Sequence, residues 1–143
     1  MGRWMDPLFE NILIGLGTGL VTGLLSGYYS GLVVSRTARF SALLRDAERP
    51  FKTVEYMQEA GFVQVAGWNE NPLDRAADDL AADKQVKASL AVRAQVAEMR
   101  VTLQKARRGE IDADEFERSL KASRAVIRRL RPHPRVLMPW GSP

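Results

Sequence analysis

The feature that most constrains this chain is an uncharged apolar stretch near its N-terminus, ILIGLGTGLVTGLLSGYYSGLVV, which runs from Ile12 to Val34. As an α-helix it is about 35 Å long, and the hydrocarbon core of a bilayer is roughly 30 Å thick. A cleaved signal peptide is the rival interpretation, but its apolar region spans only about 7–15 residues and ends in an A-x-A-like site, which this stretch lacks. The sequence therefore predicts a transmembrane helix over residues 12–34.

The charges that flank this stretch predict its orientation. Arg3 alone precedes it, whereas a basic cluster follows it: Arg36, Arg39, Arg45, Arg49 and Lys52. Lys and Arg near a span are retained on the cytoplasmic side. We therefore expect an inner (plasma) membrane protein with residues 1–11 outside and residues 35–131 as a cytoplasmic helical domain. The expected fold class is all-α, with one N-terminal transmembrane helix followed by a cytoplasmic helical hairpin or bundle.

Glycine recurs at every fourth position of the predicted span. The row consists of Gly15, Gly19, Gly23, Gly27 and Gly31, with Leu16, Leu20, Leu24, Tyr28 and Leu32 on the opposite side. Lipid gives no hydrophobic reward for joining helices, so membrane helices associate through close packing and interhelical hydrogen bonds, which small residues permit. The row predicts a helix–helix interface, either between copies of this chain or with another membrane protein.

Hydroxyl side chains accompany the glycine row, at Thr18, Thr22, Ser26 and Ser30. They fit the same interface, where they would hydrogen-bond across helices. They are also compatible with a narrow polar path through an oligomer, although no ionisable residue lies within the span.

The rest of the chain has mainly helical signals. An apolar stripe from Phe40 to Ala47 meets Pro50, and a second short helix is expected to carry Phe51, Val54 and Met57 and to end near Gly61. Residues 62–68 are interpreted as a loop that packs on the helices, because one short strand has no partner. The residues Asn71 and Pro72 predict a helix start with Asn as the cap, leading into one long helix or two with a bend, up to Arg108.

The later part of that helical region has two apolar stripes. One contains Val86, Leu90, Ala94, Ala97 and Val101, and the other contains Val92, Val96, Met99 and Leu103. A helix that is apolar on two sides needs two neighbours. The final helix is one candidate neighbour, and the segment from Phe40 to Met57 or another subunit is the other.

The turn that follows combines Gly109, which suits a helix C-terminus, with Asp112 and Glu115 at capping-box spacing. The pattern Gly109-x-Ile111-x-x-x-Glu115-Phe116-Glu117 resembles the helical-hairpin motif of the short C-terminal (SHOCT) domains of many bacterial proteins. That family usually has Thr where Asp112 stands. The resemblance covers residues 103–127 and implies a role in oligomerisation or partner contact.

The last predicted helix, residues 113–130, is amphipathic, with Phe116, Leu120 and Ile127 on its apolar side. Its basic side is either a solvated surface or a contact for anionic lipid, which attracts cytoplasmic Lys and Arg near the membrane. The candidate membrane-surface residues are Arg36, Arg39, Arg124, Arg128 and Arg131. The Pro-rich tail, residues 132–143, is expected to be extended.

The sequence carries little that indicates catalysis. It has no cysteine, its single histidine is His133, and it contains no phosphate-binding glycine motif. We therefore expect no enzyme, no cofactor and no metal. The leading hypothesis is a small single-pass scaffold that assembles through its glycine face. The first alternative is a pore-forming or holin-like subunit, and the second alternative is a membrane-tethered nucleic-acid binder. Nucleic-acid binding is disfavoured because the sequence lacks the interleaved aromatic residues of a base-stacking platform.

Overall fold

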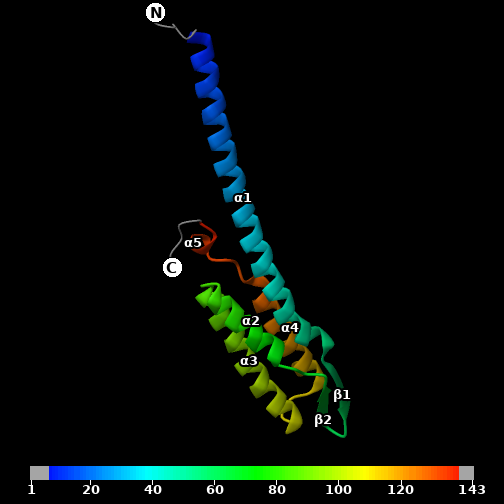
Figure 1. Ribbon diagram of the computed structural model, residues 1–143. Coiled ribbons are helices and arrows are strands. Elements are labelled where there is room, and N and C mark those ends of the chain that lie inside the picture. The colour runs from blue at the N-terminus through cyan, green and yellow to red at the C-terminus, as the bar shows by residue number, and fades with distance from the viewer. Residues whose placement is uncertain (1–6, 139–143) are drawn as a thin grey trace, which may run out of the picture.

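The structure, a computed structural model, describes residues 7–138, and the chain is mostly helical, at 77%. Its elements are, in order, α1 (Pro7–Thr53), β1 (Glu55–Glu59), β2 (Phe62–Ala66), α2 (Asn71–Ala82), α3 (Val86–Arg107), α4 (Ala113–Arg129) and α5 (Pro134–Leu137). The N-terminal half of α1 extends away from all other elements, which gather around its C-terminal half (Figure 1). The expected helical class is correct in its main part, but the two strands make the chain other than all-α.

Helix α1 is one continuous helix of 47 residues, about 70 Å long, that joins the apolar stretch to the folded part of the chain. We expected Pro50 to end a helix and a second helix to follow through Met57, and this prediction is wrong. Proline removes the hydrogen bond to the carbonyl four residues earlier. Because α1 ends at Thr53, that loss falls in its last turn, where it costs little regular structure.

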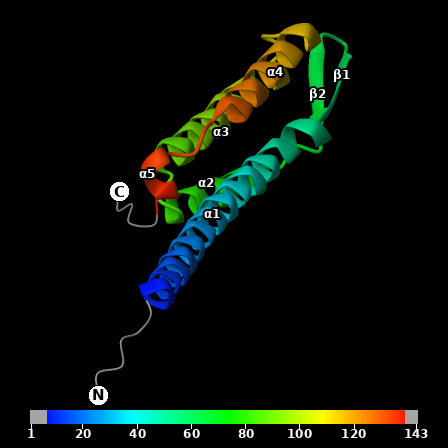
Figure 2. The ribbon, with the colours of Figure 1, turned by 90° about the horizontal axis from the view of Figure 1, so that it is seen from above.

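The segment after α1 forms a two-stranded antiparallel hairpin, in which Glu55 pairs with Ala66 and Glu59 with Phe62. The interpretation of residues 62–68 as a loop is therefore wrong, because the missing partner strand is formed by residues expected to be helical. Ala60 (φ 50°) and Gly61 (φ 86°) make the two-residue turn, with the positive φ angles that a type I′ turn requires. In Figure 2 the hairpin and α5 lie at opposite ends of the folded part of the chain, and the N-terminal half of α1 extends beyond α5.

The region from residue 71 to residue 107 folds as two helices that pack on each other, α2 and α3. The break comes at Lys84, whose φ of 62° is left-handed. Asn71 begins α2 as predicted, but Glu70 holds the cap position, and the Asn69 side chain accepts a hydrogen bond from the Asn71 N–H at 3.0 Å.

The turn between α3 and α4 follows the sequence closely. Gly109 has a φ of 70°, and the Asp112 carboxylate accepts a hydrogen bond from the Glu115 N–H at 2.7 Å, which confirms Asp112 as the cap. Helix α4 ends at Arg129, one residue before the predicted end. It packs against both α3 and the C-terminal half of α1.

One core joins the C-terminal half of α1 to α2, α3, α4 and the hairpin. Its large side chains with less than 2% exposure include Val63, Leu73, Leu80, Val92, Met99, Phe116 and Ile127. The Tyr56 ring of β1 meets the edge of Phe116 with centroids 5.2 Å apart, and Phe51 of α1 meets Trp68 at 5.3 Å. Burying a large apolar side chain stabilises a fold by roughly 1.5–3 kcal/mol. None of the core residues comes from the apolar half of α1.

Candidate membrane assembly face

The apolar half of α1 has little cover from the other residues that the structure describes. Every residue from 11 to 31 is exposed, and Leu16, Leu24 and Tyr28 each show about two thirds or more of their surface, at 72%, 66% and 70%. Soluble monomers rarely expose contiguous apolar surface of this extent. The helix is long and apolar enough to cross a membrane.

The five glycines of the predicted row lie on this exposed rod. A Cβ atom added at Gly15, Gly19, Gly23, Gly27 or Gly31 would meet nothing within 4 Å. The packing of residues 7–138 therefore does not require glycine at any of these positions. If glycine is needed at these positions so that another backbone can approach closely, that backbone belongs to a neighbouring helix.

The hydroxyl groups beside the row are partly satisfied by their own helix. Thr18 donates to the carbonyls of Ile14 and Gly15, and Ser26 donates to the Gly23 carbonyl at 3.1 Å. Such bonds to the preceding turn let Ser and Thr reside in lipid without a polar partner elsewhere. Thr22 and Ser30 are exposed on the same stretch.

Of the predicted membrane-surface residues, Arg36 and Arg39 lie where the apolar stretch ends. Arg36 Nη1 donates to the carbonyls of Val136 at 2.6 Å and Met138 at 2.9 Å, and Arg39 Nε lies 2.6 Å from an Asp83 carboxylate oxygen. Arg131 is exposed in the link between α4 and α5. The structure thus brings Arg36 and Arg39 together with α5 and the α2–α3 turn.

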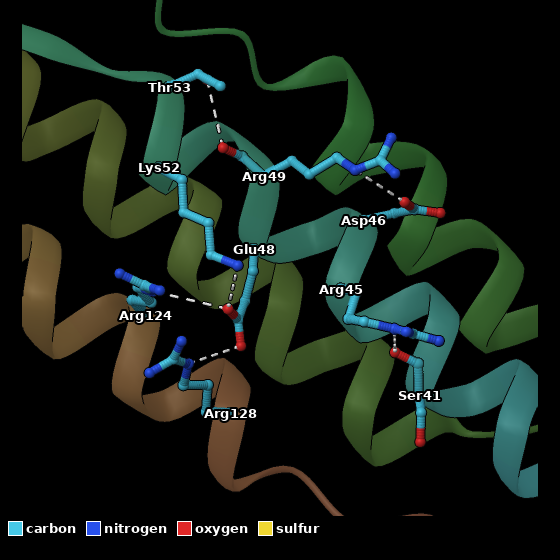
Figure 3. Close-up of polar contacts among 9 residues, drawn as sticks. All are labelled: Ser41, Arg45, Asp46, Glu48, Arg49, Lys52, Thr53, Arg124 and Arg128. Carbon is cyan, nitrogen blue, oxygen red and sulfur yellow. Dashed lines mark hydrogen bonds and ion pairs between the residues drawn. The ribbon is translucent and has the colours of Figure 1, made fainter.

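Arg124 and Arg128 lie elsewhere and form ion pairs with the carboxylate of Glu48. Figure 3 shows the arrangement: Glu48 of α1 points toward α4, and its oxygens lie 2.9 Å from Arg128 Nε, 3.3 Å from Lys52 Nζ and 3.6 Å from Arg124 Nε. Burial alone would raise the pKa of Glu48, but the hydrogen bonds from Arg128 and Lys52 outweigh it and hold the pKa below its ordinary value.

The distance of this cluster from the apolar stretch bears on its role. Glu48 lies about four helical turns beyond Val34, on the order of 20 Å along the helix. The screening length of physiological salt is shorter, at roughly 8–10 Å. This placement favours an internal ion-pair role for Arg124 and Arg128 over a contact with lipid.

Sequence reasoning missed the contact between the tail and α1. Residues 134–137, which we expected to be extended, form the one-turn helix α5, and Tyr29 Oη donates to Met138 Sδ at 3.2 Å. The sequence signal was Pro134, which begins the turn, with the His133 side chain accepting a hydrogen bond from the Arg135 N–H. The rest of the predicted tail, residues 139–143, lies outside the described residues, as do residues 1–6.

One of the two apolar stripes of α3 is also uncovered. Val92, Val96, Met99 and Leu103 are buried against the fold, whereas Val86, Leu90 and Val101 of the other stripe are 56%, 60% and 52% exposed. The segment from Phe40 to Met57 therefore does not cover this second stripe.

Comparison with protein-family models, with curated proteins and with solved structures gives no match. The resemblance of residues 103–127 to SHOCT domains accordingly stays a prediction.

Proposed function

We propose that this protein is a single-pass membrane scaffold that self-associates through the glycine face of α1 and holds its helical module at the cytoplasmic surface for a partner. One observation carries the proposal: the glycine row is exposed on an apolar rod, and within the described residues a Cβ added at any of its five positions has open space around it. Bare backbone on a lipid-embedded helix is useful where another helix lies against it. The positive residues after the span support a cytoplasmic module.

The direction of the glycine row also supports self-association. At 3.6 residues per turn, Gly23 lies roughly a quarter to a third of a turn around α1 from Ala47 and Phe51, two buried residues that face the module. A second copy that meets α1 at Gly23 therefore approaches from a different side of the helix than the module. A row that drifts slowly around the helix suits the right-handed crossing of about −40° that GxxxG pairs adopt.

The chain offers a matched pair of variants to test this face. Gly23 lies in the row, whereas Gly17 lies off it, about 160° around the helix from its neighbours Gly15 and Gly19. Both Gly23 and Gly17 have open space around them. Gly23→Leu and Gly17→Leu add the same apolar side chain within the same apolar stretch. We expect the wild type and Gly17→Leu to sediment as oligomers in detergent micelles, and Gly23→Leu to sediment as a monomer.

Two outcomes would overturn self-association through this row. They are a monomeric wild type, and a Gly23→Leu variant that keeps the wild-type size. If the purified protein opens ion-selective conductance steps in a planar bilayer, the pore-forming hypothesis would be preferred to the scaffold. A module from residue 35 onward whose nucleic-acid affinity falls steeply with salt would favour the nucleic-acid binder.

A further inference from the structure

A cavity of about 360 Å³ opens between α1, the α2–α3 turn and α5. Figures 1 and 2 both show these three parts of the chain meeting beside the middle of α1. Phe40, Ala82 and Val136 give the cavity apolar walls, and Arg36, Arg39 and Lys84 bring positive charge to it. Its volume lies in the range of small-molecule sites, which is roughly 300–1,000 Å³.

The charge in this cavity is unbalanced in favour of an anion. Asp83 is the one acidic residue among the described residues that line the cavity, and it pairs with Arg39 at 2.6 Å, so within residues 7–138 Arg36 and Lys84 have no carboxylate partner. Arg36 uses Nη1 for two backbone carbonyls of the tail, so the guanidinium is fixed in place while its Nε and Nη2 donors have no hydrogen-bond partner in residues 7–138. Fixed guanidinium donors are well suited to phosphate oxygens.

The backbone around Lys84 also favours an anion in the cavity. Lys84 has a left-handed φ of 62°, which turns the chain toward α3. The next residue, Gln85, lines the cavity and stands at the N-terminus of α3, where no side chain caps the helix. The positive end of a 22-residue helix dipole therefore lies beside the basic side chains.

The cavity also lies at the depth of lipid phosphates if α1 spans a bilayer. Arg36 and Arg39 follow Val34 within two helical turns, about 3 and 8 Å further along the helix. The headgroup layer on each side of the hydrocarbon core is roughly 5–8 Å thick. Arg124 and Arg128, which lie on Glu48, are far below this layer.

From these four observations we propose that the cavity binds the phosphate of an anionic phospholipid from the bilayer that α1 crosses. The headgroup phosphate lies between Arg36, Arg39 and Lys84, and Phe40 and Val136 contact the apolar part of the lipid. The proposal rests on the membrane span of the proposed function, but it does not require self-association. Basic pockets beside membrane helices on the cytoplasmic side are a known way to hold acidic headgroups.

The test titrates the full chain in neutral detergent with short-chain phosphatidylglycerol, and with phosphatidylcholine and inorganic phosphate as separate arms. We expect one saturable phosphatidylglycerol site per chain, with weaker binding in both other arms. Inorganic phosphate that binds as tightly as phosphatidylglycerol would overturn the lipid as the ligand.

Three variants locate the site within the chain. Lys84→Gln should weaken phosphatidylglycerol binding about fivefold, the effect of one near-surface cation. Lys87→Gln, an exposed lysine that does not line the cavity, should change it less than about twofold. Asp83→Asn should strengthen binding, a gain that an unfolded variant cannot give. Equal losses in the two lysine variants, or weaker binding by Asp83→Asn, would overturn the cavity as the site.

The same titration in Gly23→Leu separates this inference from the proposed function. Binding that survives in a monomeric Gly23→Leu shows that the site lies within one chain. Binding that is lost on becoming monomeric would overturn a site built by one chain alone.

Discussion

At the scale of single residues, Glu48 is the charge on which the contact between α1 and α4 depends. Its side chain is 11% exposed, and its three cationic partners are Lys52, Arg124 and Arg128. Glu48→Gln leaves these cations close together without a counter-charge. We expect the free energy of unfolding to fall by about 1–3 kcal/mol, less than for a fully buried pair because the cations are partly exposed.

Urea unfolding of the full chain in detergent, followed by tryptophan fluorescence, measures this loss. The control is Glu98→Gln, because Glu98 is an exposed helical glutamate without an ion pair among the described residues. It should change the free energy of unfolding by less than about 0.5 kcal/mol. Equal losses in the two variants would contradict a special role for Glu48.

The acid range gives an independent check on the same carboxylate. Burial pushes its pKa up, but the hydrogen bonds from Arg128 and Lys52 outweigh this effect and hold the pKa below the ordinary 4.5. A carboxyl with a lowered folded pKa stabilises the fold above its unfolded pKa, and this contribution is lost as the pH falls through the folded value. The wild type and Glu48→Gln should therefore differ fully at neutral pH and converge below pH 4.5. A constant difference would show that Glu48 acts through something other than its charge.

Arg124 and Arg128 illustrate what the periodicity of a helix predicts and what it leaves open. The periodicity of residues 113–130 correctly assigned Phe116, Leu120 and Ile127 to the core. It also placed the arginines on the opposite side, but it carried no information on what lies there. Glu48 is 80 residues from Arg128 in the sequence, so only the packing of α4 on α1 reveals the ion pair.

At the scale of elements, the β1–β2 hairpin is the part of the fold that the sequence concealed. Two-residue hairpins are usually signalled by Asn-Gly or Asp-Gly, whereas this turn is Ala60-Gly61. Four of the five β1 residues are exposed, so the strand has little of the apolar alternation that identifies a half-buried strand. By contrast, the long apolar helix and the Asp112 cap were predictable, because length, apolarity and a local side-chain hydrogen bond determine them.

The turn itself makes a stability prediction. Alanine at a left-handed φ costs roughly 1–2 kcal/mol, whereas asparagine tolerates this conformation. Ala60→Asn should therefore raise the free energy of unfolding by about 0.5–1 kcal/mol, and Ala60→Val should lower it, because a branched Cβ is less tolerant of positive φ. Thermal unfolding of the two variants checks the sign of both changes. Destabilisation by Asn would contradict the type I′ geometry.

At the scale of the whole molecule, the tail contacts α1 where its apolar half ends and so helps to position the helical module relative to that half. Val136 and Met138 accept hydrogen bonds from Arg36, so the chain returns from α4 to the point where the apolar stretch ends. The hairpin lies at the far end, away from α5 (Figure 2). With α1 across a bilayer, α5 is thus closest to the membrane, and β1–β2 is the part that reaches furthest from it. Sequence patterns could not give this arrangement, because they do not encode contacts between residues 100 positions apart.

The charges that flank the apolar stretch predict its orientation in a membrane, and because the sequence has no cysteine, a single introduced thiol can test this prediction. Asp6→Cys introduces one thiol before the span, and Gln58→Cys introduces one on the exposed surface of β1. Because positive residues follow the span, we expect a membrane-impermeant maleimide to label Asp6→Cys in intact spheroplasts, and Gln58→Cys only after lysis. The reverse pattern would place the module outside. Labelling of both variants in intact spheroplasts would mean that α1 does not cross the bilayer, and the glycine face would then need a partner other than a second membrane-spanning helix.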